Sequence, residues 1–199
     1  MSQKSAISFL TNASPEEIQK ISALVARAND TIDKYFGIVT AFDVVICRGS
    51  WEMEVQAISR RKEPSEESIY SNTKSVGMTD YRLGEIVIRC DIAKYGHYLH
   101  ELIHGVISRT HPHQLREGMA WYFTLKLTED YKYVRPYYHS WVDEMYVHPT
   151  KRLAEIVGEE FLKDFALGRA SLDYELLPRD VQELFIPEEI FYCQKRYRK

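Results

Sequence analysis

The spacing of apolar residues near the start of the chain predicts a long helix. Between Ser14 and Gly37, apolar positions recur at alternating steps of three and four, which places them on one face of a helix. Ser14 fits the N-cap, Pro15 fits the first turn, and Glu17 can complete a capping box. We therefore expect this helix to pack on a core through its apolar face.

The next part of the chain alternates between short apolar runs and polar connections. Three of the runs predict strands: residues 41–47, 76–80 and 85–90. Only four residues join the last two runs, so they predict a hairpin. Residues 51–60 predict a short helix, and residues 62–73, rich in Glu, Ser and Lys, predict an exposed loop.

Beyond residue 90 the pattern is helical. Four segments have helical spacing: residues 91–109, 115–127, 150–165 and 179–185. Strands followed by helices predict an α+β fold, with a small mixed sheet and then a helical part. We expect one domain over residues 1–199, with the sheet in residues 1–110 and helices in residues 111–199.

Composition and charge exclude several classes of protein. The chain has 199 residues and a net charge of −3, which argues against a nucleic-acid binder. No apolar run exceeds five residues, so we expect no transmembrane helix, and the N-terminus lacks the apolar core of a signal peptide. The three cysteines form no C-x-x-C pair and are expected to be free thiols. These features together predict a cytoplasmic protein.

The candidate chemistry is concentrated in an H-E-x-x-H motif formed by His100, Glu101 and His104. Residues four apart on a helix project from one face, so both imidazoles can bind a single Zn²⁺. Glu101 flanks the same face, and its carboxylate can reach a water on the metal. The alternative is a histidine-rich helix whose imidazoles are satisfied within the core.

A catalytic zinc site needs a third protein ligand. The metzincin pattern fails, because Ile107 and Thr110 stand where that class has Gly and His. Glu117, separated from His104 by twelve residues and on a second predicted helix, is the better candidate; the alternative is a surface glutamate in the first turn of that helix. Three other histidines of this region are expected not to bind the metal: His97, His111 and His113.

The motif and the residues after it resemble a known class of enzymes. H-E-x-x-H followed by P-x-x-L-x-E-G-x-A-x-Y at residues 112–122 is similar to the gluzincin zinc metallopeptidases, in a thermolysin-like, peptidase-MA-like form. The resemblance extends over residues 76–123. It implies a zincin-like fold with an edge strand over the motif helix, zinc ligands at His100, His104 and Glu117, and a catalytic Glu101. It also implies an extended peptide substrate, which we expect to pair with residues 85–89.

Two parts of such a site stay open in the sequence. Thermolysin has an acidic residue four positions after its glutamate ligand, where this chain has Trp121, so no partner is indicated that would orient a histidine ligand. A donor to the oxyanion is expected within residues 131–141, where Tyr137 is preferred over three other candidates: Arg135, Tyr138 and His139.

The sequence therefore predicts a hydrolase, a zinc-dependent metallopeptidase acting on a peptide or protein substrate, with Glu101 as the general base. One alternative is a catalytically inactive zinc-binding scaffold or interaction module of the same fold. Another is a helical interaction protein that binds no metal.

Overall fold

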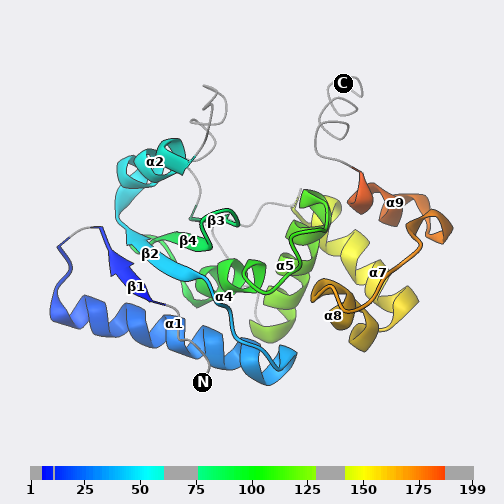
Figure 1. Cartoon of the computed structure of the whole chain (residues 1–199), viewed down its shortest axis with the longest axis horizontal. Coiled ribbons are helices and arrows are strands. Elements are labelled where there is room, and N and C mark those ends of the chain that lie inside the picture. Colours follow the sequence, from blue (N-terminus) through cyan, green and yellow to red (C-terminus); the bar gives the residue numbers. More distant parts are fainter. Residues whose placement is uncertain (1–5, 11, 61–75, 129–141, 187–199) are drawn as a thin grey trace. The chain divides into compact units, whose positions relative to one another are not determined.

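Short apolar strands and amphipathic helices give this protein a mixed α+β fold, as predicted (Figure 1). The computed structural model describes residues 6–10, 12–60, 76–128 and 142–186. The chain divides into two compact units, Met1–Gly105 and Val106–Lys199. That the whole chain is a single domain stays a prediction.

A four-stranded mixed sheet forms the centre of the first unit. Its strands are β1 (Ile7–Phe9), β2 (Asp43–Cys47), β3 (Gly77–Asp80) and β4 (Glu85–Arg89). Their order is β1-β2-β4-β3, in which β1, β2 and β4 run parallel and β3 is antiparallel to β4. The predicted hairpin is confirmed as β3–β4, whereas β1 was not expected from the sequence.

The strand order corrects the expected position of a bound peptide. β4 pairs with β2 on one side and with β3 on the other, so both of its backbone edges are already used. The expectation that a peptide would pair with residues 85–89 is therefore wrong. β3 lies at the edge of the described sheet next to β4.

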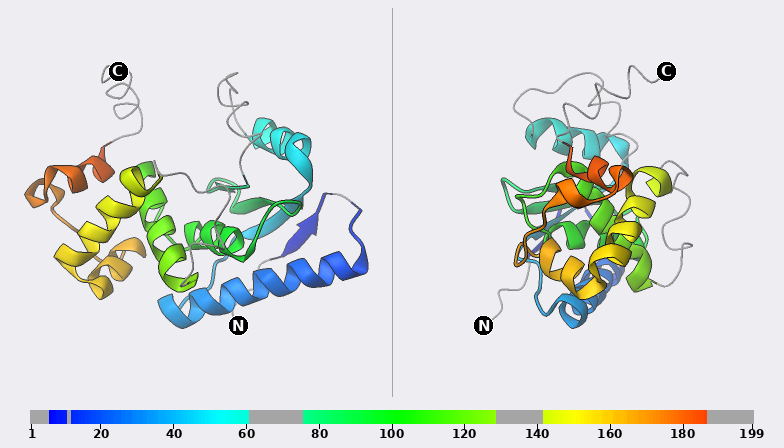
Figure 2. Two further views of the ribbon diagram at one scale, coloured as in Figure 1. Left: turned by 180° about the vertical axis from the view of Figure 1, so that it is seen from behind. Right: turned by 90° about the vertical axis from the view of Figure 1, so that its right-hand side faces the viewer.

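Helices cover both faces of this sheet: α1 (Pro15–Phe36), α2 (Gly49–Arg60) and α4 (Tyr95–His104). Met53 of α2 packs against Val45 and Val87 on one face. Because side chains alternate along a strand, Ile86 and Ile88 point to the opposite face, which α4 contacts and where α1 packs on α4. Seen from behind, α1 runs the length of this unit (Figure 2).

The sequence predicted the start of α1 correctly, but it did not predict the ends of α4. The capping box of Ser14 and Glu17 at the start of α1 is confirmed. The motif helix α4 is shorter than expected: it begins at Tyr95 with Lys94 as its N-cap, and it ends at His104. Asp91, the first residue of the expected helix, lies before α4, where its carboxylate accepts a hydrogen bond from the Gly49 N–H and pairs with Arg89.

The secondary-structure elements described in the second unit are all helices. Its elements are α5 (His113–Thr128), the π-helix η2 (Asp143–Val147), α7 (His148–Val157), α8 (Glu159–Ala166), the 3₁₀-helix η3 (Tyr174–Leu176), α9 (Arg179–Gln182) and the 3₁₀-helix η4 (Glu183–Phe185). Residues 150–165, predicted as one helix, belong to two, because Gly158 has a φ of 85° and ends α7. α7 packs against both α5 and α8.

The contact between α5 and α7 depends on a glycine. A Cβ on Gly118 would lie 2.3 Å from Thr150 Oγ1 and 3.2 Å from the carbonyl oxygen of Tyr146. Thr150 is fully buried, so this approach is part of the core of the unit. The glycine that follows Glu117 in the sequence therefore sets how closely α7 packs on the helix that carries Glu117.

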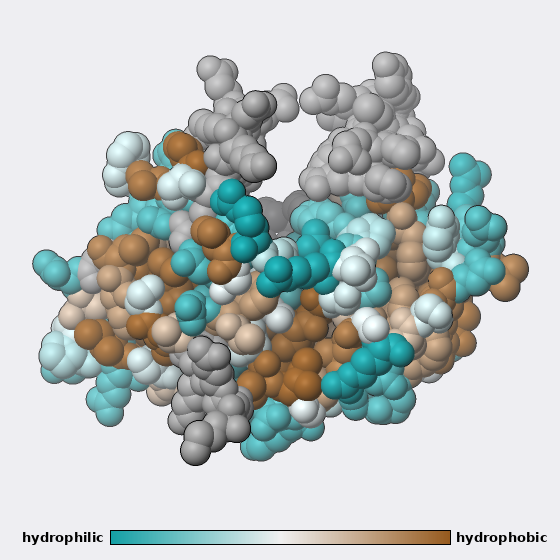
Figure 3. Space-filling model, viewed as in Figure 1, coloured by the Kyte–Doolittle hydropathy of each residue, from teal (hydrophilic) through white to brown (hydrophobic). Residues whose placement is uncertain are grey.

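The surface mixes polar and apolar residues. The most exposed large apolar side chains include Trp51, Leu83 and Leu176. On the face drawn in Figure 3, hydrophobic groups are interrupted by hydrophilic ones. Among the described helices, none combines the length and the apolar character needed to cross a membrane. The loop predicted at residues 62–73 lies outside the described residues.

Candidate metal centre

The two histidines of the motif meet on one face of α4, as their spacing predicts. Their Nε2 atoms lie 3.2 Å apart, and the two rings are nearly perpendicular, at 87°. Two nitrogens bound to one tetrahedral zinc at 2.0–2.1 Å are about 3.3 Å apart, a separation that follows from those bond lengths. Both histidines are buried, with 7% of His100 and 4% of His104 exposed. Two imidazole nitrogens on α4 thus lie at the spacing that one ion requires.

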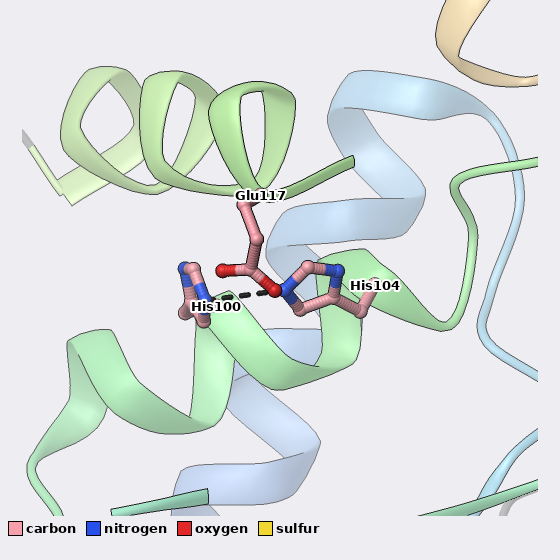
Figure 4. Close-up of side chains that lie close together, drawn as sticks. All are labelled: His100, His104 and Glu117. Carbon is pink, nitrogen blue, oxygen red and sulfur yellow. Dashed lines mark hydrogen bonds between the residues drawn. The ribbon is translucent and has the colours of Figure 1, made fainter. Parts of the chain in front are cut away.

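Glu117 on α5 is the third member of the cluster (Figure 4). One ligand atom from each of His100, His104 and Glu117 lies within 4.8 Å of the other two. Glu117 is half-buried, and the three residues together could hold a metal ion. Two imidazoles and one carboxylate are the protein ligands of many catalytic zinc sites, so the donor set fits zinc.

Glu101 is held from the neighbouring strand. The Thr79 hydroxyl donates a hydrogen bond of 3.0 Å to Glu101 Oε2, and the Glu101 side chain is buried. Gly77, two residues before Thr79, leaves room for it: a Cβ there would lie 2.6 Å from both Cγ and Oε1 of Glu101. The alternate positions 77 and 79 of β3 therefore fix where the carboxylate of the motif lies.

Tyr81 supplies the contact to a histidine that the sequence left open. Its hydroxyl lies 3.2 Å from His104 Nδ1, the ring nitrogen opposite the one that faces His100. Tyr81 continues the series of Gly77 and Thr79 at steps of two, and this alternation is the signal that could have identified it. Sequence analysis placed Tyr81 only in a connection between strands.

The other histidines of the region have structural contacts. His97 is buried and accepts a hydrogen bond from the Lys94 N–H through Nδ1; burial, aided by the charges of His100 and Lys94, lowers the pKa of its imidazole to about 4. His111 Nε2 lies 2.7 Å from the carbonyl oxygen of Phe165. Neither residue belongs to the cluster of metal-ligating atoms found in the described part of the chain, and nor does His113.

Trp121 and the expected oxyanion donor are the two remaining positions of the predicted site. Trp121, at the position that is acidic in thermolysin, packs against the apolar cluster of Val142, Tyr146 and Val147. The preferred oxyanion donor, Tyr137, lies outside the described residues, as do the other three candidates: Arg135, Tyr138 and His139.

Comparison with known proteins found no similar protein. No protein-family model matches the chain, and neither a curated protein nor a solved structure matches it. The chemistry of this site is therefore argued from its own residues.

Proposed function

We propose that this protein is a zinc-dependent metallopeptidase of the gluzincin type, with a zincin-like fold. The observation that carries the proposal is the facing pair of Nε2 atoms on His100 and His104, 3.2 Å apart, with Glu101 held beside them. The clustering of Glu117 with this pair supports it further. An Nε2–H···Nε2 hydrogen bond between the two imidazoles has the same spacing, so it is the carboxylate of Glu117 beside the pair that favours a metal over a histidine-rich helix packed for stability alone.

The metal would be held by His100, His104 and Glu117. Zinc bound by three protein ligands polarises a substrate carbonyl and lowers the pKa of a coordinated water to about 7. Glu101 does not belong to the ligand cluster, so its carboxylate is available for proton transfer.

Glu101 acts as the general base in this proposal. It takes a proton from the attacking water and gives it to the amine that leaves when the peptide bond breaks. The hydroxyl of Thr79 holds Oε2 at 3.0 Å, so the carboxylate is oriented before a substrate arrives. A base fixed in position avoids the entropic cost of finding its geometry during the reaction.

The substrate is a peptide in extended conformation, added to the edge of β3. Arg89 N–H bonds to Val76 C=O across the hairpin, and hydrogen-bonded pairs alternate along an antiparallel ladder. The backbone groups of Gly77 and Thr79 therefore point away from β4, towards the edge. A strand paired there would run beside Glu101, which both residues contact.

The test combines zinc content with cleavage of a peptide library, read by mass spectrometry. The variants are Glu101→Gln, His104→Ala and, as a matched control on α2 at the other face of the sheet, Glu54→Gln. Glu101→Gln should keep stoichiometric zinc, because Gln is nearly isosteric, and should lower the cleavage rate by about 10²–10⁴-fold. His104→Ala should lose zinc and activity together, and Glu54→Gln should behave as the wild type.

Equal cleavage by the wild type and Glu101→Gln would contradict the mechanism and indicate a contaminating peptidase. Zinc bound at one equivalent with no cleavage by any variant would favour the alternative, a zinc-binding scaffold. Full zinc retention in His104→Ala would contradict the metal site itself.

A further inference from the structure

Tyr81 contacts the apolar ring of Phe42 and the polar imidazole of His104. Its ring meets the buried ring of Phe42 edge-on, with centroids 5.8 Å apart and an interplanar angle of 81°. Its hydroxyl reaches His104 Nδ1 at 3.2 Å, and the Tyr81 and His104 rings are also nearly perpendicular, at 88°. Packing against Phe42 therefore aims the phenol oxygen at one nitrogen of His104.

The contact between Tyr81 and His104 matters because of the protonation state that metal binding requires of His104. An imidazole that binds a metal through Nε2 must be neutral and carry its proton on Nδ1. That Nδ1–H then needs an acceptor, and the Tyr81 oxygen lies where the acceptor is required. The same bond limits rotation of the ring, so Nε2 stays directed at His100 Nε2.

The placement belongs to a wider pattern on β3. Gly77 and Thr79 lie opposite Ile88 and Ile86 on the face of the sheet that meets α4, and Tyr81 follows at the next alternate position. Thr79 contacts the carboxylate of the motif, and Tyr81 contacts one of its imidazoles. One strand and its turn thus support both chemical groups of the helix.

We propose that Tyr81 is a positioning residue for the metal site, accepting the Nδ1–H bond of His104 and so holding its Nε2 in the ligating orientation. This rests on the metal-binding part of the proposed function and is independent of which reaction follows. Outer partners of histidine ligands typically contribute 10–100-fold to metal affinity.

The experiment measures the zinc dissociation constant by competition with a chromophoric chelator. Tyr81→Phe removes the hydroxyl and keeps the ring. Its matched control is Tyr95→Phe on α4, the helix that carries His104, which removes the hydroxyl that lies 2.8 Å from Thr31 Oγ1. Tyr81→Phe should weaken zinc binding by about 10–100-fold, and Tyr95→Phe should leave it unchanged.

A second readout separates positioning from stability. In the zinc form of the wild type, the Nδ1 proton of His104 should be visible by NMR and slow to exchange, and in Tyr81→Phe it should exchange rapidly. The melting temperature measured in chelator should be the same for Tyr81→Phe and the wild type. A merely structural tyrosine would give the opposite result: a lower melting temperature in chelator with no change in the proton signal.

Several outcomes would overturn the inference. Equal zinc affinity in Tyr81→Phe and the wild type would do so, as would an equal loss in Tyr95→Phe, because the effect would then not be specific to His104. Absence of zinc binding by the wild type would overturn both this inference and the proposed function. Zinc affinity that depends on Tyr81 in a protein without peptidase activity would support the inference while contradicting the peptidase.

Discussion

At the scale of single residues, the sequence predicted the members of the site that lie on one helix. His100, Glu101 and His104 are close in sequence, and the helical period alone decides that the two imidazoles share a face. Thr79 and Tyr81 contact this helix from 22 and 23 residues away, through hydroxyl groups. Such contacts depend on how the strand and the helix pack, so the sequence indicates the reactive groups and not the residues that hold them.

The buried His97 should make the metal-free protein less stable in mild acid. Its pKa is about 4 in the folded state against 6.5 as the reference value. Above pH 6.5 both states hold a neutral ring, and between pH 6.5 and 4 only the unfolded state takes up the proton. The free energy of unfolding therefore decreases as the pH is lowered. The loss relative to neutral pH is about 2 kcal/mol at pH 5, and it levels off below pH 4.

Urea unfolding at pH 7 and pH 5, in chelator, measures this loss. His97→Asn keeps an acceptor for the Lys94 N–H and cannot titrate, so the difference between the two pH values should shrink by about 2 kcal/mol in that variant. Equal differences for the wild type and His97→Asn would show that this imidazole does not carry the pH dependence.

At the scale of elements, the sequence predicts which helices and strands exist better than it predicts where they end or how the strands are ordered in the sheet. The β3–β4 hairpin follows from two apolar runs and a short connection, whereas β1 has only three residues and leaves no periodic signal. The segment at residues 150–165 keeps apolar spacing on both sides of Gly158, so one helix was predicted where a left-handed backbone position makes two. Local patterns also cannot say which strands pair, and this is why β4 was taken for an edge.

The close approach of α5 and α7 should make Gly118 intolerant of a side chain. Gly118→Ala places a methyl group 2.3 Å from Thr150 Oγ1, so either the Thr150 side chain must rotate or the two helices must separate. We expect a loss of about 1–3 kcal/mol in the free energy of unfolding, the usual cost of overpacking, measured by thermal or denaturant unfolding.

A double-mutant cycle tests whether the loss in Gly118→Ala comes from the clash with Thr150. Thr150→Ala removes the oxygen, so Gly118→Ala combined with Thr150→Ala should be less destabilised than the sum of the two single changes. Strict additivity would mean that the two positions do not meet.

At the scale of the whole molecule, the sequence correctly predicts the class of fold. All four strands of the sheet come before α4 in the chain and lie in Met1–Gly105, and the elements of the described part of Val106–Lys199 are all helices. The expected change from sheet to helices at residue 110 lies close to this division. Glu117 was predictable only as a candidate for the cluster, because it and the histidines are on different helices.

Metal binding should be visible in the stability of the entire chain. A ligand that binds only the folded state stabilises it, by about 2.7 kcal/mol when its free concentration is 100 times its dissociation constant. Added zinc should therefore raise the melting temperature of the wild type, and a chelator should reverse the rise. In Glu117→Ala this rise should be much smaller, while His111→Ala, whose imidazole bonds to the Phe165 carbonyl, should retain it. The reverse order of these two variants would contradict the assignment of the third ligand.

The sheet has a further property that concerns contacts between copies of the chain. Its two outer strands in the described residues, β1 and β3, have three and four residues, and the inner strands have five each. An exposed edge invites another chain to pair with it, and the risk grows with the length of unpaired backbone. Edges this short offer few hydrogen bonds to a second sheet, so the shortness of β1 and β3 limits edge-to-edge aggregation.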